Sequence, residues 1–236
     1  MDSLTSRVRT AHGDAWQVHG ALRAGAEERP GIRLMASGLG HPQWNNADIT
    51  APDADMDAAA AWYATRGVPW GMRVPRELEW SRGSMLFYKR LMGLEPAAFV
   101  PPPAADVRVA DDLDTVVTID AAAFGTDPAG AWLTAQFDAP RFETALGYLD
   151  GEPVATGYSV RSDGRAGPCL YVAGVGVLPH ARRRGLGAAL TAWLIARGFE
   201  QGATLAHLHP DDDGAARLYE RLGFVEVPGF NVFVNQ

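Results

Sequence analysis

The sequence has very little cysteine and no long apolar run. Cys169 is the only cysteine among 236 residues, which excludes an intrachain disulfide and a cysteine-rich zinc site. No stretch approaches the roughly 18 apolar residues of a membrane span, and Met1 to His12 shows no signal-peptide pattern. We therefore expect a cytoplasmic protein that is not bound to a membrane and that uses no metal.

Positive charge is scarce too, since the formal net charge is −7. A nucleic-acid-binding domain needs a basic face, so we expect no nucleic-acid partner. Lys89 is the only lysine, and almost all positive charge is arginine; we attribute this to codon usage. Apolar residues make up 47% of the chain, which is enough to bury a core.

The clearest break in the chain is Pro101-Pro-Pro-Ala-Ala-Asp106. Consecutive prolines favour extended backbone and cannot continue a helix or a central strand. We predict an N-terminal domain over residues 1–100, a linker over 101–105 and a C-terminal domain over 106–236.

Strand-like and helix-like segments alternate in the C-terminal half. The predicted strands cover residues 106–110, 144–149, 153–160, 170–177, 204–209 and 224–233. The predicted helices cover residues 111–124, 132–137, 185–199 and 214–222. Asp150-Gly151 is a typical hairpin turn. The alternation predicts an α/β fold with a mixed sheet covered by helices on both sides.

The N-terminal half is less regular. Its predicted strands cover residues 44–50 and 68–74, and its predicted helices cover 56–66 and 84–92. The segment Phe87 to Leu94 resembles Leu218 to Phe224 when one residue is gapped, which favours a weak internal repeat. The alternative is that amphipathic helices ending in glycine simply look alike.

A loop rich in arginine and glycine, Arg182-Arg-Arg-Gly-Leu-Gly187, lies between a predicted strand and a predicted helix. The first turn of a helix leaves N–H groups without partners and adds roughly half a positive charge. With three arginines and a backbone that glycine makes more flexible, the loop is predicted to bind a phosphate or pyrophosphate. The alternative is an exposed basic turn. The loop is neither a Walker loop nor a dinucleotide fingerprint.

The same loop resembles the (Gln/Arg)-x-x-Gly-x-(Gly/Ala) signature of the GNAT superfamily of acyl-CoA-dependent N-acyltransferases. Asp212-Asp-Gly-Ala-Ala-Arg-Leu-Tyr-Glu-Arg-Leu-Gly-Phe224 resembles the family's Asn-x-x-Ala-x-x-Leu-Tyr-x-x-x-Gly-Phe stretch, with Asp212 in place of asparagine. The resemblance covers about residues 106–236. It implies a mixed, mostly antiparallel, splayed sheet flanked by helices.

The resemblance also implies acetyl-CoA as co-substrate. Backbone groups of one strand would pair with the pantetheine arm, and the loop amides would hold the pyrophosphate. The coenzyme-binding residues expected on this basis are Val175, Val177, Arg182, Arg183, Arg184, Gly185, Gly187 and Ala188. The N-terminal half would be a degenerate GNAT-like copy, and its aspartates 53, 55 and 57 would repel a pyrophosphate at the corresponding helix.

The resemblance makes Tyr219 the candidate proton donor to the departing thiolate. The proton acceptor is open, because Tyr171 to Val177 carries no acid where many family members have glutamate. His207 and His209 share one face of a predicted strand and are candidates, as are Asp211 and a water chain.

We thus expect acetyl transfer to a primary amine, by direct attack on the thioester. The alternatives are a non-catalytic protein that senses acyl-CoA and a scaffold that binds neither substrate. The acceptor amine, small molecule or peptide, cannot be read from the sequence. The oligomeric state is also open, a homodimer included.

Overall fold

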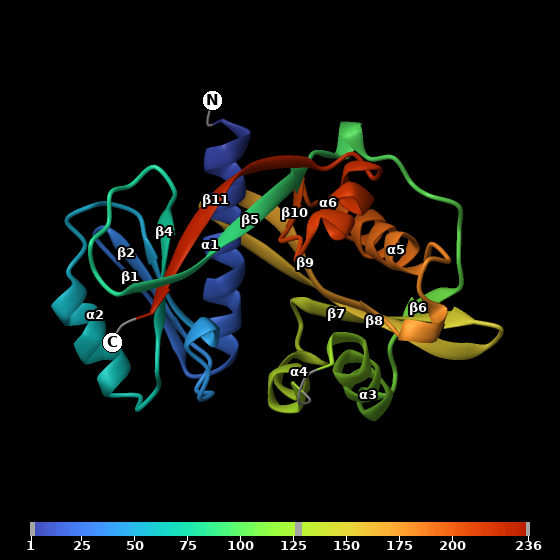
Figure 1. The fold of residues 1–236 in the computed structure, drawn as a ribbon, viewed down its shortest axis with the longest axis horizontal. Coiled ribbons are helices and arrows are strands. Elements are labelled where there is room, and N and C mark those ends of the chain that lie inside the picture. Colours follow the sequence, from blue (N-terminus) through green and yellow to red (C-terminus); the bar gives the residue numbers. More distant parts are fainter. Residues whose placement is uncertain (1–2, 126–128, 235–236) are drawn as a thin grey trace.

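The computed structural model of the protein describes residues 3–125 and 129–234. The helices of this part of the chain are α1 (Leu4–Leu22), α2 (Met56–Ala64), α3 (Leu113–Phe124), α4 (Gly130–Gln136), α5 (Leu186–Glu200) and α6 (Asp213–Glu220). Its strands are β1 (Gly25–Arg29), β2 (Ile32–Ala36), β3 (Asn45–Ile49), β4 (Gly71–Pro75), β5 (Ser84–Leu94), β6 (Val107–Val109), β7 (Phe142–Leu149), β8 (Glu152–Gly164), β9 (Gly167–Val177), β10 (Leu205–Leu208) and β11 (Val225–Val234). Figure 1 shows their arrangement.

All the strands of the described chain join one sheet of eleven, in the order β1-β2-β3-β4-β11-β5-β10-β9-β8-β7-β6. Neighbours are antiparallel except for β3 with β4 and β9 with β10, which are parallel. Both parallel pairs are joined by a crossover helix, α2 in the first case and α5 in the second. The predicted mixed, mostly antiparallel sheet is therefore confirmed.

The two halves of the chain repeat one topology and exchange their last strands. In the first half, the antiparallel strands β1, β2 and β3 lead through α2 to the parallel β4, and in the second half the antiparallel strands β6 to β9 lead through α5 to the parallel β10. The final strand of the first half, β5, then pairs with β10 of the second half. The final strand of the chain, β11, lies between β4 and β5. The division at residues 101–105 stays a prediction, and the sheet runs without a break across it.

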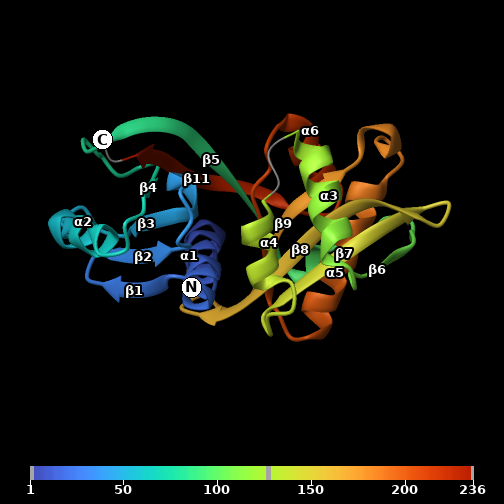
Figure 2. The same cartoon turned by 90° about the horizontal axis from the view of Figure 1, so that it is seen from below.

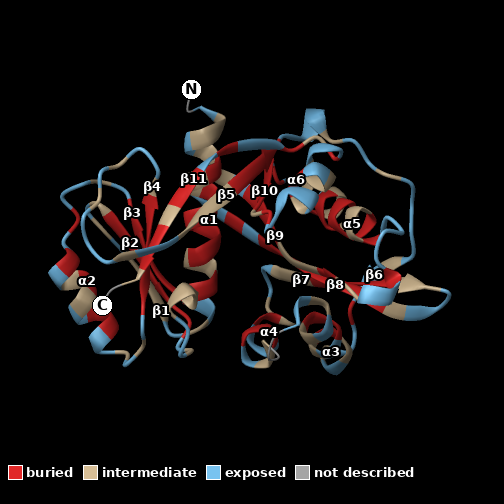
Figure 3. Cartoon of the chain, in the orientation of Figure 1, coloured by how far each residue is buried: buried red, intermediate tan, exposed pale blue. Residues whose placement is uncertain are grey.

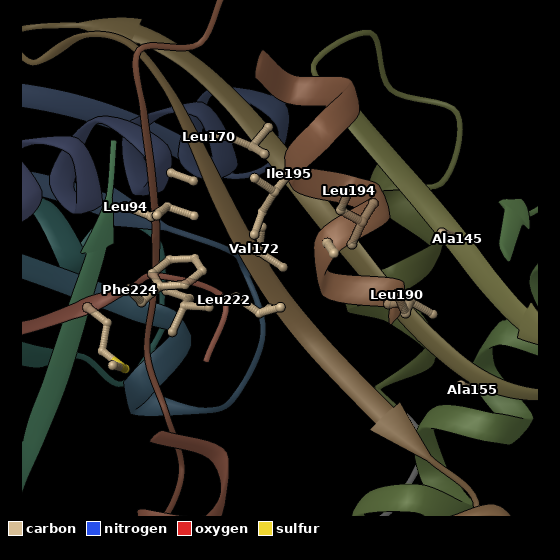
Figure 4. Packing of buried hydrophobic residues seen from close by; sticks show 14 of the residues in the cluster. Leu94, Ala145, Ala155, Leu170, Val172, Leu190, Leu194, Ile195, Leu222 and Phe224 are labelled. Carbon is tan, nitrogen blue, oxygen red and sulfur yellow. The ribbon is translucent and has the colours of Figure 1, made fainter. Parts of the chain in front are cut away.

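Helices cover both faces of the sheet. On one face, α1 lies at the centre and α3 and α4 lie beside it over β7, β8 and β9 (Figure 2). On the other face of the second half, Leu190, Leu194 and Ile195 of α5 pack on Leu170 and Val172 of β9 (Figure 4). Strands β2, β3 and β10 are buried along their whole length, and the linker is mostly exposed (Figure 3).

Two parts of the N-terminal half differ from the sequence prediction. Residues 84–92, predicted as a helix, form part of strand β5. Leucine, methionine, lysine and arginine favour helices locally, but this segment is held between β10 and β11, whose residues come more than a hundred positions later. Residues 87–94 and 218–224 are therefore similar in sequence but differ in secondary structure, since the first segment is a strand and the second begins in a helix. This sequence similarity was wrong as evidence of a repeat.

The segment before residue 44 also contains elements that were not predicted. Helix α1 buries polar side chains where an amphipathic pattern needs apolar ones, among them His12, Asp14 and His19. Asp14 accepts hydrogen bonds from Arg33 (2.6 Å) and from the amide of Ala166 (2.9 Å). Strands β1 and β2 follow α1 and form the far edge of the sheet.

Polar groups are also buried where the halves meet. The fully buried Arg73 donates to both carboxylate oxygens of Asp48 and lies 3.1 Å from Nε2 of His12. The guanidinium also lies over the ring of Trp16, 4.4 Å from its centroid. The buried charge is thus paired, as a charge removed from water must be.

Candidate active site

Strands β9 and β10 separate halfway along the sheet. Their parallel pairing covers Cys169 to Tyr171 and ends at the pair Tyr171–His207. Strand β10 stops at Leu208, whereas β9 continues to Val177, still paired with β8. In the described chain, the β9 segment from Val172 onward has no strand on its β10 side. This opening offers free backbone groups to an extended ligand.

A β-bulge lies within that opening. Between the pairs Thr156–Gly176 and Tyr158–Ala173, β9 contains one residue more than β8. Gly174 has φ +61°, and a Cβ there would lie 2.9 Å from the ring of Tyr158. Only glycine fits this position without displacing the tyrosine. The bulge therefore bends β9 just after the point where its pairing with β10 ends.

The arginine- and glycine-rich loop follows β9 and leads into α5. Gly185, with φ +81°, is the N-cap of α5 and supplies no side-chain cap. The amides of the first helical turn, at Leu186, Gly187 and Ala188, have no intrahelical acceptor. A Cβ on Gly185 would meet no atom within 4 Å, so the space in front of the helix is open. These features fit a diphosphate bound at the helix N-terminus.

The three arginines of the loop differ in their contacts. Arg182 donates from Nε to the carbonyl oxygen of Val177 (3.0 Å) and from Nη2 to that of Ala123 (2.7 Å). Its guanidinium therefore ties the loop to the ends of β9 and α3. The exposed side chains of Arg183 and Arg184 make no hydrogen bond or ion pair within the described chain, so they are free to meet an anion.

Carboxylates at the N-terminus of the corresponding helix in the first half exclude an anion. Helix α2 has Asp55 as its N-cap, and this carboxylate accepts a hydrogen bond from the amide of Ala58 (2.9 Å). Asp57 adds a second acid in the first turn. A carboxylate thus already occupies the position that a phosphate would take at α5.

Tyr219 lies on α6 and packs against the hydrophobic core between α5 and the sheet, with its ring 5.9 Å from that of Phe224. Burial, helped by the nearby Asp211 and Asp212, raises the pKa of its phenol to about 12. Asp212 caps α6 by accepting from the amide of Ala215 (2.7 Å), which is the role that asparagine would also fill.

The two histidines on β10 are less suited to accept a proton. His207 is fully buried and stacked on Tyr171, and burial lowers the pKa of its imidazole to about 3. His209 has Nδ1 3.1 Å from the carbonyl oxygen of Arg90 and Nε2 3.7 Å from Asp211. Burial and the neighbouring Lys89 lower its imidazole pKa to about 3 as well. Both rings are neutral but weakly basic at pH 7.

Sequence reasoning missed two titratable groups near the opening. Asp120 is buried on α3, and burial raises its pKa to about 6. The sequence does contain an indication of this, because helical spacing puts Asp120 on the same apolar face of the helix as Val116 and Ile119. Lys89 is half-buried on β5, and burial together with Arg73 lowers its pKa to about 7. The sequence analysis noted Lys89 as the only lysine but attributed this to codon usage.

Other parts of the described chain offer fewer candidates. A cavity of about 820 Å³ lies between α1 and the β8–β9 turn, and none of the predicted site residues lines it. No group of three or more metal-ligating side chains occurs among the residues that the structure describes. None of the described helices is long and apolar enough to cross a membrane.

Comparisons with known proteins agree with this geometry. Residues 113–224 match the sequence profile of a family described as the acetyltransferase (GNAT) family. Among solved structures, the chain is similar to a GCN5-related N-acetyltransferase from Kribbella flavida, with 22% identity, a TM-score of 0.73 and coverage of 97% of this chain and 95% of that one. No curated protein matched the chain.

Two further solved structures share the fold. A functionally unknown conserved protein from Staphylococcus epidermidis has 13% identity and a TM-score of 0.64, over 88% of this chain and 91% of that one. A GCN5-related N-acetyltransferase-like protein from Streptococcus suis has 12% identity and a TM-score of 0.58, over 99% of this chain and 100% of that one. At these identities the likeness is one of fold, and it spans both halves of the chain.

Proposed function

Residues 113–224 form an acetyltransferase domain of the GNAT family, and from this premise we propose that the chain transfers an acetyl group from acetyl-CoA to a primary amine. The second half of the chain would carry the reaction. The first half would pack against it and form part of the wall around the acceptor amine. A homodimer and a cytoplasmic location remain predictions.

One observation carries the proposal: the open N-terminus of α5 lies directly after the strand that has lost its partner. Gly185 leaves the helix amides uncapped, and β9 ends only a short loop away at Val177. Coenzyme A combines a pyrophosphate with an extended arm that has amide groups. A helix N-terminus suits the first part, and an unpaired strand edge suits the second.

The expected contacts follow from these positions. The amides from Leu186 to Ala188 would hold the pyrophosphate, with Arg183 and Arg184 adding positive charge. Backbone groups of Val175 and Val177 would pair with the pantetheine arm. The carbonyl of Val177 already accepts from Arg182, so Arg182 would position the loop while the two following arginines meet the anion.

The chemistry is a direct attack of the amine nitrogen on the thioester carbonyl carbon. A new C–N bond forms, the C–S bond breaks, and the amine loses a proton. Only about one lysine-type amine in 2,500 is neutral at pH 7, so the acceptor needs a group that takes this proton. Thiols have pKa values near roughly 8.5, and Tyr219, with a pKa of about 12, is a weaker acid than that. A hydrogen bond from its phenol to the sulfur, strengthening as charge builds, would still help the thiolate leave.

The rival function is a protein that binds acyl-CoA as a signal and transfers nothing. It needs the same loop and the same strand edge. The buried titratable groups near the opening favour the enzyme, because shifted pKa values cluster at catalytic sites. A sensor has no use for a group that accepts a proton.

Release of free thiol separates the two functions. Purified protein is incubated with acetyl-CoA and a panel of amines that covers amino acids, polyamines, aminoglycosides and peptide N-termini, and the thiol is followed with a chromogenic disulfide. The enzyme gives amine-dependent thiol release that saturates with at least one amine. Calorimetric binding of acetyl-CoA without thiol release for any amine would identify a sensor, and absence of both would leave a scaffold.

A further inference from the structure

Asp120 differs from the other carboxylates buried in the described chain. Asp14 is paired with Arg33 and the amide of Ala166, and Asp48 is paired with Arg73. Asp120 is only 8% exposed and makes no hydrogen bond or ion pair with any residue that the structure describes. An unpaired carboxylate at this depth destabilises the fold. A buried carboxylate without a partner in its own chain is therefore a candidate for binding or catalysis.

The position of Asp120 is the second observation. Helix α3 packs on β8 and β9 through the face that carries Val116, Ile119 and Asp120. Oδ1 of Asp120 lies 4.0 Å from the point where a Cβ on Gly174 would stand. Gly174 belongs to the bulge of β9, within the segment that has no partner strand on its β10 side. The carboxylate therefore faces the backbone along which the thioester arm would run.

The surroundings of Asp120 supply no positive charge. From β8, the titratable neighbour is Tyr158, whose pKa the Asp120 carboxylate helps to raise and whose hydroxyl accepts a hydrogen bond from Nε1 of Trp132 on α4 (3.3 Å). From β9 the neighbour is Gly174, which has no side chain. The guanidinium of Arg182 binds the carbonyl of Ala123 at the end of α3 and not the carboxylate. A cation that pairs with Asp120 must come from outside the described chain.

We propose that Asp120 is the proton acceptor for the attacking amine. This inference rests on the proposed acetyl transfer. The acceptor enters as an ammonium ion and pairs with the carboxylate beside the bulge, and Asp120 takes one proton from it, which frees the nitrogen lone pair. The neutral amine attacks the thioester carbonyl carbon, a C–N bond forms and the C–S bond breaks. The nitrogen loses a second proton to the departing thiolate, which leaves as free thiol, and Asp120 releases its proton to water.

This assignment explains the absence of an acid on β9 itself. Asp120 reaches the bulge from the neighbouring helix, whereas His207 and His209 come from β10. The carboxylate, whose pKa burial raises to about 6, is ionised at pH 7 and is a stronger base than imidazoles with a pKa of about 3. It also favours acceptors that carry a positive charge, such as alkyl amines, over neutral anilines.

The test compares Asp120→Asn with wild type on the best amine from the panel. Asparagine keeps the size and removes the base, so kcat/KM should fall by roughly 10²-fold or more. Wild-type kcat/KM should decline below pH 6 as the carboxylate is protonated, and the variant should lose this acid limb. Because no pairing partner is lost, the melting temperature of the variant should equal or exceed that of wild type, and acetyl-CoA affinity should be unchanged. A merely structural role would not move the pH profile.

Asp114→Asn is the matched control, since Asp114 is an exposed acid on the same helix; it should keep both rate and pH profile. If Asp120→Asn does not fold, Asp120→Ala is measured in its place with the same expectations. Activity within about threefold of wild type, or an unchanged acid limb, overturns the assignment. A wild-type protein that binds acetyl-CoA but releases no thiol with any amine refutes the proposed function instead.

Discussion

His207 stacks on Tyr171, with the ring centroids 5.0 Å apart and the ring planes inclined by 17°. These two residues are also the last pair that joins β9 to β10. His12 of α1 meets both rings edge-on. The point at which the sheet opens is thus sealed on the α1 side by three buried aromatic rings, two of which are imidazoles held in their neutral form.

Stability should fall as the solution is made mildly acidic. Burial lowers the pKa values of His207 and His209 to about 3 and those of His12 and His19 well below normal. Below about pH 6.5 these imidazoles bind a proton in the unfolded chain but stay neutral in the native state. Each ring therefore lowers the free energy of unfolding by up to about 1.4 kcal/mol for each pH unit. Asp120, whose pKa is raised, has the opposite effect on the free energy of unfolding, but it is one group against four histidines.

Differential scanning calorimetry at several pH values measures this dependence. Between pH 7.5 and 5.5 the melting temperature should drop by at least about 5 °C. His207→Phe should reduce the drop because one imidazole is gone, while His180→Gln, an exposed position, should leave it unchanged. A melting temperature that does not change over this range would contradict the neutral state of the buried rings.

The coenzyme loop can be tested with Gly187→Glu. A Cβ at Gly187 would meet Leu218 and Val177 at 3.6 and 3.8 Å, which are ordinary contacts, so the fold should survive. The new carboxylate would lie at the helix N-terminus where the pyrophosphate must bind. Acetyl-CoA affinity, measured by calorimetry, should fall at least tenfold.

The control for this variant is Gly40→Glu, which adds the same charge at an exposed glycine of the first half. It should bind acetyl-CoA as wild type does, with one site per chain. Dephospho-coenzyme A should still bind wild type, because it retains the pyrophosphate. Equal affinity of the Gly187→Glu variant and wild type would remove the loop from the coenzyme site.

Removal of the Tyr219 hydroxyl should slow turnover and little else. Tyr219→Phe keeps the ring packing against Phe224, and turnover should fall by roughly 10²-fold, within the range for a lost proton donor. The melting temperature and acetyl-CoA affinity should stay near wild type. Tyr148→Phe, on β7 beside the edge strand β6, is the control and should behave as wild type. Turnover of Tyr219→Phe within about threefold of wild type would make Tyr219 a packing residue.

The exchange of β5 and β11 predicts that the second half is unstable alone. A fragment of residues 106–236 would leave β10 and β11 without their partners on β5 and β4. It should show no cooperative thermal unfolding by circular dichroism, and co-expression with residues 1–105 should restore it. A cooperative transition close to that of the full chain would instead support an independent domain from residue 106.

The sequence predicted most of the second half because its signals are local. Asp112 caps α3, and its Oδ1 lies 3.1 Å from the amide of Asp114. The Asp150-Gly151 turn and the loop before α5 also lie where the pattern put them. Each of these elements depends on residues within a few positions, which a sequence shows directly.

The errors arose where distant residues decide the structure. Strand β5 pairs with β10 and β11, and nothing within its own residues indicates those partners. Helix α1 was missed because its buried histidines and aspartate interrupt the apolar stripe, and their partners come from other elements. Asp120 was overlooked for the same reason: a carboxylate is informative only once the helix face on which it lies is known to be buried.

The order of synthesis gives the exchanged strands a further consequence. When the first half leaves the ribosome, β4 has an open edge, and the strand that covers it, β11, is made last: Phe230 pairs with Pro75. Both partners of strand β5, which are β10 and β11, are also synthesised after it. Pairings this remote in sequence form slowly, and open edges attract other chains in the meantime. The nascent chain therefore carries unpaired edges on β4 and β5 until β11 emerges, and that interval is when it is most exposed to aggregation and to binding by chaperones.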